Sequence, residues 1–118
     1  MHELSLAGAV VNTAVKHAAE RRVTVVTLRV GRLRQVVPDT LDFYFGFVAE
    51  GTLCEGARLE QEVVPACLVC SECGNDWELD LPIFRCPRCG TTGVEIRSGN
   101  EFEVESIEVE EPECIAPR

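Results

Sequence analysis

The sequence predicts an α+β fold, in which a small mixed β-sheet and two helices carry an inserted, zinc-ribbon-like unit with four cysteines. Three observations support this prediction. Two segments have apolar residues at helical spacing, several segments alternate or are rich in β-branched residues, and two C-x-x-C pairs lie close together in the second half of the chain. A final strand follows the cysteine unit, and we expect it to dock on the open edge of the first sheet.

The first element is a helix over residues 4–20. Its expected buried face follows spacings of three and four residues: Leu4, Ala7, Val11, Ala14 and Ala18. Residues 23–30 come next and predict a strand, because they are rich in β-branched residues and Val26, Leu28 and Val30 alternate. Gly31 ends this strand.

A second helix is expected from Pro38 to about Gly51. Asp39 or Thr40 would cap its amino end, since short polar side chains accept hydrogen bonds from the free N–H groups there. Its apolar face would comprise Leu41, Tyr44, Phe45 and Val48.

The remaining elements are predicted to be extended. Residues 57–64 form a half-buried strand with Ala57, Leu59 and Val63 inward, and residues 94–96 form a short one. In residues 101–110 the apolar positions change parity, which predicts either a bulge near Ser106 or a strand covered on both faces. The predicted domains are residues 1–66 plus 97–118, which form an α/β domain, and residues 67–96, which form a metal-binding domain.

The two C-x-x-C pairs predict one structural zinc ion held by Cys70, Cys73, Cys86 and Cys89. Each pair is followed by a glycine, Gly74 or Gly90, which lets the backbone fold back toward the sulfurs. Two such turns close a tetrahedral thiolate site that has no open position for a substrate. Iron of the rubredoxin type uses the same four ligands, so the spacing alone does not separate the two metals.

Three other cysteines need an interpretation. Cys67 could pair with Cys70, but we favour Cys70 and Cys73 because only this pair has a following glycine that matches the second pair. Cys67, Cys54 and Cys114 are then expected to be free thiols in ordinary structural positions.

Composition limits the classes of function. The chain of 118 residues has 11 Lys and Arg against 20 Asp and Glu, a formal net charge of −9, so a nucleic-acid partner is not expected. We find no phosphate loop or nucleophile–base pair, and therefore expect no enzyme. No apolar run is long enough for a membrane span, and a cytoplasmic protein with reduced cysteines is expected.

The amino terminus offers a second metal site. The Met1 amine, the His2 imidazole and the first backbone amides are nitrogen donors that square-planar nickel(II) or copper(II) favours, and Glu3 adds a carboxylate. Many proteins have an early histidine, so these residues alone indicate such a site only weakly. The other histidine, His17, is expected on the solvated side of the first helix.

Four pieces of the sequence, in this order, resemble the HypA/HybF family of hydrogenase nickel-insertion proteins. They are Met1-His2-Glu3 before a helix, Glu55-Gly56-Ala57 before an acidic strand, the two cysteine pairs, and Gly99-Asn100-Glu101-Phe102 before a strand with Ser106-Ile107-Glu108. Together they cover nearly the whole chain.

The resemblance implies a nickel metallochaperone that helps to insert nickel into nickel–iron hydrogenase. His2 would be the main nickel ligand, assisted by Met1 and Glu3, and the first domain would be the nickel-binding one. Implied partners are a HypB-type GTPase, the hydrogenase large subunit and, in some organisms, urease accessory proteins; monomer and homodimer both stay open. No histidine follows His17, so we expect an all-cysteine zinc site without histidine exchange.

Two alternatives from other classes are kept. The chain could be a zinc-ribbon protein-interaction module, which the cysteine pairs fit, or a rubredoxin-like iron electron carrier, in which Trp77 and Phe84 would shield the metal. The sequence does not give the nickel affinity, the complete coordination or the nickel enzyme served.

Overall fold

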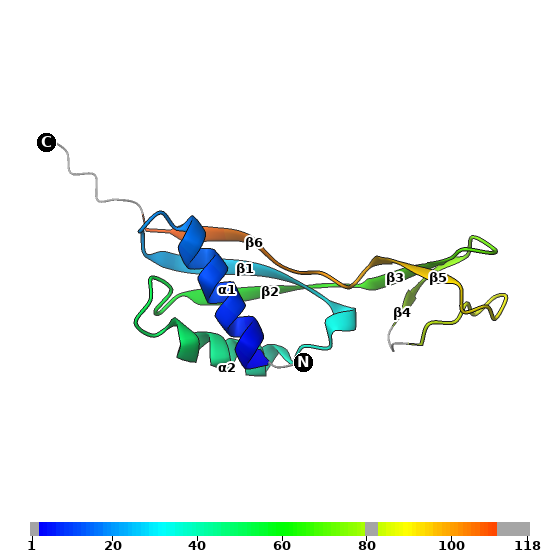
Figure 1. Cartoon of the computed structure of the whole chain (residues 1–118), viewed down its shortest axis with the longest axis horizontal. Helices are drawn as coiled ribbons and strands as arrows, with labels where there is room; N and C mark the ends of the chain where they lie inside the picture. Colours follow the sequence, from blue (N-terminus) through cyan, green and yellow to red (C-terminus); the bar gives the residue numbers. More distant parts are fainter. Residues whose placement is uncertain (1–2, 80–82, 111–118) are drawn as a thin grey trace, which may run out of the picture.

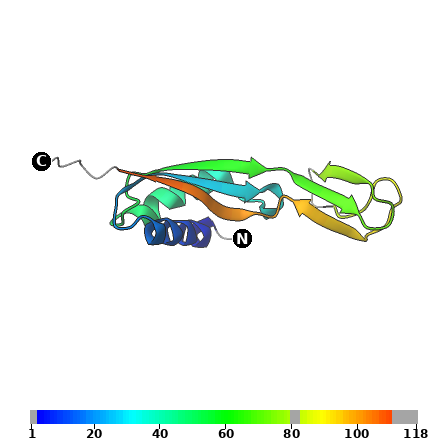
Figure 2. The same ribbon diagram turned by 90° about the horizontal axis from the view of Figure 1, so that it is seen from above.

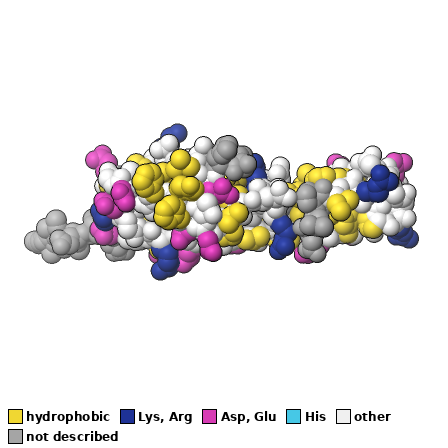
Figure 3. Space-filling model, turned by 90° about the horizontal axis from the view of Figure 1, so that it is seen from below, with side chains coloured by type: hydrophobic (Ala, Val, Ile, Leu, Met, Phe, Trp, Pro, Cys, Tyr) yellow, Lys and Arg dark blue, Asp and Glu magenta, His cyan; other side chains and the backbone are white. Residues whose placement is uncertain are grey.

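The computed structural model describes residues 3–79 and 83–110. The molecule is elongated, with extents of 68 × 29 × 17 Å, and has two three-stranded sheets placed end to end (Figures 1 and 2; Figure 3 shows the surface). In chain order the elements are α1 (Glu3–His17), β1 (Val23–Gly31), the 3₁₀ helix η1 (Arg32–Arg34), α2 (Pro38–Ala49), β2 (Arg58–Val64), β3 (Ala66–Cys70), β4 (Asp76–Leu79), β5 (Val94–Ser98) and β6 (Phe102–Val109). Neither of the two α-helices in the described part has the length and apolar character to cross a membrane.

The first sheet has the order β2-β1-β6 and is mixed, as predicted. β1 runs parallel to β2 and antiparallel to β6, so the last strand of the chain docks on the free edge of β1. The register between β1 and β6 shifts where Thr27 pairs with Ser106 and Leu28 with Val104, which leaves Glu105 as the extra residue. The predicted bulge near Ser106 is confirmed.

The second sheet has the order β4-β3-β5 and is antiparallel. The sequence predicted only β5 of its three strands. Strand periodicity is hidden in β3 because all five of its residues are apolar, so no alternation shows, and in β4 because four residues are too few to show a period.

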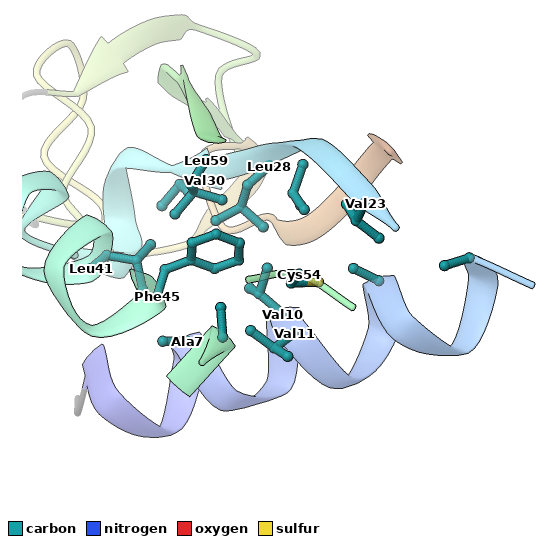
Figure 4. Close-up of a cluster of buried hydrophobic side chains, with 14 residues drawn as sticks. Ala7, Val10, Val11, Val23, Leu28, Val30, Leu41, Phe45, Cys54 and Leu59 are labelled. Carbon is teal, nitrogen blue, oxygen red and sulfur yellow. The ribbon is translucent and has the colours of Figure 1, made fainter. Parts of the chain in front are cut away.

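The main core lies between the first sheet and the two helices, whose buried side chains point toward one another (Figure 4). The core residues are Ala7, Val10, Val11, Ala14, Ala18, Val23, Val26, Leu28, Val30, Leu41, Phe45, Ala49, Cys54 and Leu59. Two predicted core positions are wrong: Leu4 and Val63 are both about half exposed. Leu4 lies in the first turn of α1, where the sheet does not reach, and Val64 is buried instead of Val63.

The start of α2 also differs from prediction. Its N-cap is Val37, Pro38 occupies the first turn, and no side chain of the cap residue bonds to the helix end. Pro38 tolerates the first helical position because it has no N–H to satisfy there, so the helix begins two residues earlier than an Asp39 cap would place it.

The two sheets meet at a tight crossing of three chain segments. Gly31 N donates to Glu101 O at 2.6 Å, and Leu33 N donates to Gly99 O at 2.8 Å. A Cβ on Gly31 would lie 2.0 Å from the Gly99 carbonyl oxygen, and one on Gly99 would lie 2.4 Å from Ala66 Cα. Only glycine permits so close an approach of the backbones.

Candidate metal centre

The first cysteine pair lies where β3 ends. Cys70 is the last residue of β3, and the chain turns so that Gly74 N donates to Cys70 O at 3.0 Å. Gly74 has φ +75°, which glycine adopts without strain. The second pair repeats this turn, with Gly90 N donating to Cys86 O at 2.9 Å and Gly90 at φ +78°. The two glycines therefore have the role that the sequence predicted.

The turns bring all four thiols together. The Sγ atoms of Cys70, Cys73, Cys86 and Cys89 lie within 4.8 Å of one another, and the Cys70–Cys89 and Cys73–Cys86 pairs are 3.5 and 3.6 Å apart. Tetrahedral thiolates about 2.3 Å from a metal are separated by about 3.8 Å. The donor set and its spacing therefore fit one tetrahedral metal ion.

Hydrogen bonds from backbone N–H groups stabilise the ionised form of two of the four thiols. Cys70 Sγ accepts from Cys73 N and Glu72 N, each at 3.4 Å, and these bonds lower the pKa of Cys70. Burial alone would raise the pKa of Cys86, but bonds from Cys89 N and Arg88 N, together with the neighbouring thiols, lower it to about 6.

The other two thiols retain their protons more strongly. Thr91 N favours ionisation of Cys89, but the neighbouring sulfurs and burial raise the pKa of Cys89 to about 12. The pKa of Cys73 is also raised: the amide of Asn75 works against burial and the adjacent thiols Cys70 and Cys86. Near neutral pH Cys86 is therefore ionised while Cys73 and Cys89 stay protonated, because charges so close together repel one another.

Contacts between the loops hold the two turns together. Ser71 Oγ donates to Gly93 O at 2.6 Å, and Thr91 Oγ1 donates to the Glu72 carboxylate at 2.5 Å. The sequence analysis did not single out these residues. Their only sequence feature is their position: Ser71 and Glu72 lie inside the first cysteine pair, and Thr91 follows the glycine after the second.

The remaining cysteines lie apart from this cluster. Cys67 is half-buried in β3, while Cys54 is fully buried in the main core, where burial raises its pKa. Both are free thiols. Cys114 lies outside the described residues.

The predicted nickel residues are only partly visible. Met1 and His2 lie outside the described residues. Glu3 begins α1, and its carboxylate accepts a hydrogen bond from Val37 N at 3.2 Å (Figure 1 shows the amino end beside the start of α2). This contact at the start of α2 was not predicted, because a backbone N–H leaves no trace in the sequence. His17 is exposed on α1, as predicted.

Comparison with known proteins shows the family to which this chain is similar. Residues 1–109 match the family described as "Hydrogenase/urease nickel incorporation, metallochaperone, hypA". A relative from Geobacter metallireducens, named hydrogenase maturation factor HypA, is 43% identical over 110 residues, which cover 93% of this chain and 100% of the relative. A relative of the same name from a Roseiflexus species is 45% identical over 122 residues and covers 98% of this chain and 99% of its own.

A solved structure has the same fold. The solution structure of the Ni metallochaperone HypA from Helicobacter pylori superposes with a TM-score of 0.68 at 23% identity, covering 92% of this chain and 97% of that one. Both the helix-bearing sheet and the cysteine unit fall within this coverage.

Proposed function

Because this chain belongs to the HypA family of hydrogenase and urease nickel-incorporation proteins, we propose that it is a nickel metallochaperone that loads nickel–iron hydrogenase during maturation. It would carry nickel(II) as cargo rather than as a resident cofactor. A carrier must release its metal, and a site at the chain end with few ligands suits that task better than a closed cage.

We assign nickel binding to His2, with Met1 and Glu3 assisting through main-chain nitrogen or side chain. The single observation that carries this assignment is the bond between the Glu3 carboxylate and Val37 N at 3.2 Å. It fixes Glu3, the first described residue of α1, against the start of α2. The imidazole and amide nitrogens would form the square-planar set that nickel(II) favours.

The test compares the two histidines of the chain. His2→Ala should abolish nickel(II) binding in titration calorimetry, whereas His17→Ala, which alters an exposed side chain on α1, should bind nickel as the unaltered protein does. Zinc content measured by elemental analysis should be the same in all three proteins. Unchanged nickel affinity in His2→Ala would refute the assignment.

We further propose that the four-cysteine cluster holds zinc, in a structural role, through Cys70, Cys73, Cys86 and Cys89. A closed four-thiolate shell and backbone N–H bonds to sulfur suit zinc, but they also suit iron. Elemental analysis and the visible spectrum separate the two, since an iron–thiolate protein is red and a zinc protein is colourless. One tightly held zinc and one looser nickel per chain are expected.

The finer assignments follow the same proposal. Residues 1–66 with 97–118 would form the nickel-binding domain and residues 67–96 the zinc-binding domain. A HypB-type GTPase and the hydrogenase large subunit would be partners, the chain itself would not be an enzyme, and free cysteines suit the reducing cytoplasm.

A further inference from the structure

The outer side of α2 exposes two large aromatic side chains. Phe43 is 70% exposed and Phe47 is 62% exposed, and they lie one helical turn apart on the side of α2 opposite the buried Phe45. We call Phe43 and Phe47 the α2 aromatic pair. Seen from below, hydrophobic side chains gather on this face of the molecule (Figure 3).

Folding does not account for this pair. Full burial of a Phe side chain contributes about 1.5–3 kcal/mol, and neither Phe43 nor Phe47 obtains it within the chain. The ring of Phe43 meets Tyr44 edge-on, with centroids 5.4 Å apart, which orients the ring while its outer face stays open. Adjacent exposed aromatic residues of this kind are typical of protein interfaces.

The charged residues on α2 itself all have one sign. α2 and its C-cap carry Asp39, Asp42 and Glu50, all exposed, and no basic residue. Among the ion pairs of the described residues, none includes any of these three carboxylates. They are therefore available to a partner with positive charge.

The start of α2 contacts the first turn of α1. Val37, 52% exposed, precedes α2 and its N–H donates to the Glu3 carboxylate, and Leu4, 46% exposed, follows Glu3. Exposed apolar side chains therefore also lie near the start of α2.

We propose that the outer side of α2 is a docking site for a partner protein that presents an apolar groove bordered by Lys and Arg. Phe43 and Phe47 enter the groove as anchors at i and i+4, as in other helix-in-groove complexes, and Asp39, Asp42 and Glu50 meet the basic border. This inference goes beyond the proposed function, because it does not require that nickel binds at His2.

A second copy of the chain is the competing occupant. The four-cysteine unit exposes Ile83, at 60%, and Phe84, at 40%, next to Arg85, so it has apolar and basic groups of its own. The experiment must therefore separate self-association from binding of another protein.

The full-length protein is expressed in its native cells with the photo-crosslinker p-benzoylphenylalanine in place of Phe43 or Phe47. The crosslinker in place of His17, on the other helix, is the control. After irradiation, mass spectrometry identifies the crosslinked peptides. We expect one other protein to be captured from positions 43 and 47 and not from 17, at a segment with apolar residues flanked by Lys or Arg.

The purified partner is then titrated with variants. Phe43→Ser with Phe47→Ser should weaken binding about tenfold or more, and Asp42→Lys with Glu50→Lys should do the same, with affinity falling as salt rises. Ile96→Ser removes another exposed apolar side chain, 46% exposed, and should change nothing. Circular dichroism verifies that each variant is folded.

Three results would overturn the proposal: crosslinks to residues 83–85 of a second copy, no crosslinks above the control, or full binding after charge reversal. Nickel titration of the double Phe variant keeps the two proposals apart. The double Phe variant should bind nickel with the affinity of the unaltered protein. Nickel titration therefore tests His2 as a ligand, and partner titration tests docking, independently of each other.

Discussion

The two sheets of this protein are stabilised in different ways. Among the described residues, the first sheet packs with α1 and α2 around fourteen buried residues. The buried cluster of the second sheet comprises Ala66, Leu68 and Leu79, supported by partly buried Leu33, Trp77 and Val94. So small an apolar cluster does not offset the entropy of ordering some thirty residues. The comparison teaches that the first region is stabilised by apolar burial, while the second depends on its four thiolates and a metal.

The largest effect that would test this contrast is loss of the metal. Cys86→Ser should lower the metal content to near zero and unfold β3, β4 and β5, because the cluster that joins the two turns is lost, while α1, α2 and the first sheet stay ordered. Elemental analysis and hydrogen exchange measure the two effects. Cys67→Ser is the control: it alters a cysteine outside the cluster and should retain metal. Unfolding of the whole chain by Cys86→Ser would contradict the contrast.

The converse test removes a buried side chain from the main core of the first region. Phe45, only 2% exposed, lies at the centre of the main core, so Phe45→Ala should destabilise that region by about 3–5 kcal/mol in urea unfolding. Metal content should not change. The matched control is Phe43→Ala on the same helix, which should cost less than about 0.5 kcal/mol because that ring is exposed. Equal losses for the two would show that the main core is misassigned.

The number of protons released when zinc binds tests the protonation states of the four cysteines. The pKa of Cys86 is about 6, so this thiol is ionised at neutral pH, whereas the pKa of Cys89, about 12, and the raised pKa of Cys73 keep these two thiols protonated. Zinc must therefore displace at least two protons near pH 7, and its affinity should fall by at least about 100-fold per pH unit on acidification. Below about pH 6 Cys86 also takes up a proton and the fall becomes steeper. Calorimetry in buffers of different ionisation enthalpy counts the protons; a count near zero or near four would contradict the thiol assignment.

The smallest effect is expected on the outer face of the first sheet. Arg29 lies 3.6 Å from Glu62, 3.3 Å from Glu103 and 3.9 Å from Glu105, all partly exposed. Glu62→Gln should change the unfolding free energy by less than about 1 kcal/mol, and the difference should shrink in 1 M salt, because exposed ion pairs are screened. A larger, salt-independent loss in urea unfolding would mean that charge pairing supports the first region as much as its core does.

The sequence predicted those features whose residues recur with a regular period or at a fixed spacing. Both helices, the strands of the first sheet, the bulge near Ser106 and the grouping of the four cysteines follow from such patterns. The predicted N-cap of α2 was wrong because Pro38 starts a helix without a polar cap. Strand β3 was missed because all its residues are apolar and show no alternation, and β4 because it is short. The bond from Val37 N to Glu3 joins residues 34 positions apart through a backbone group, so no sequence pattern could indicate it.

The glycine crossing between the sheets limits how the molecule can be rebuilt. Gly31 and Gly99 leave no room for a Cβ, and Leu33, which lies between Gly31 and α2 in sequence, packs on the small core of the second sheet. A metal unit transferred from a relative by its cysteine segment alone would therefore lack its own Leu33 and would not match the backbone at the glycine crossing. A workable chimera must exchange residues 31–34 and 99–101 together with the cysteine segment, so the natural module of this fold comprises three separate segments.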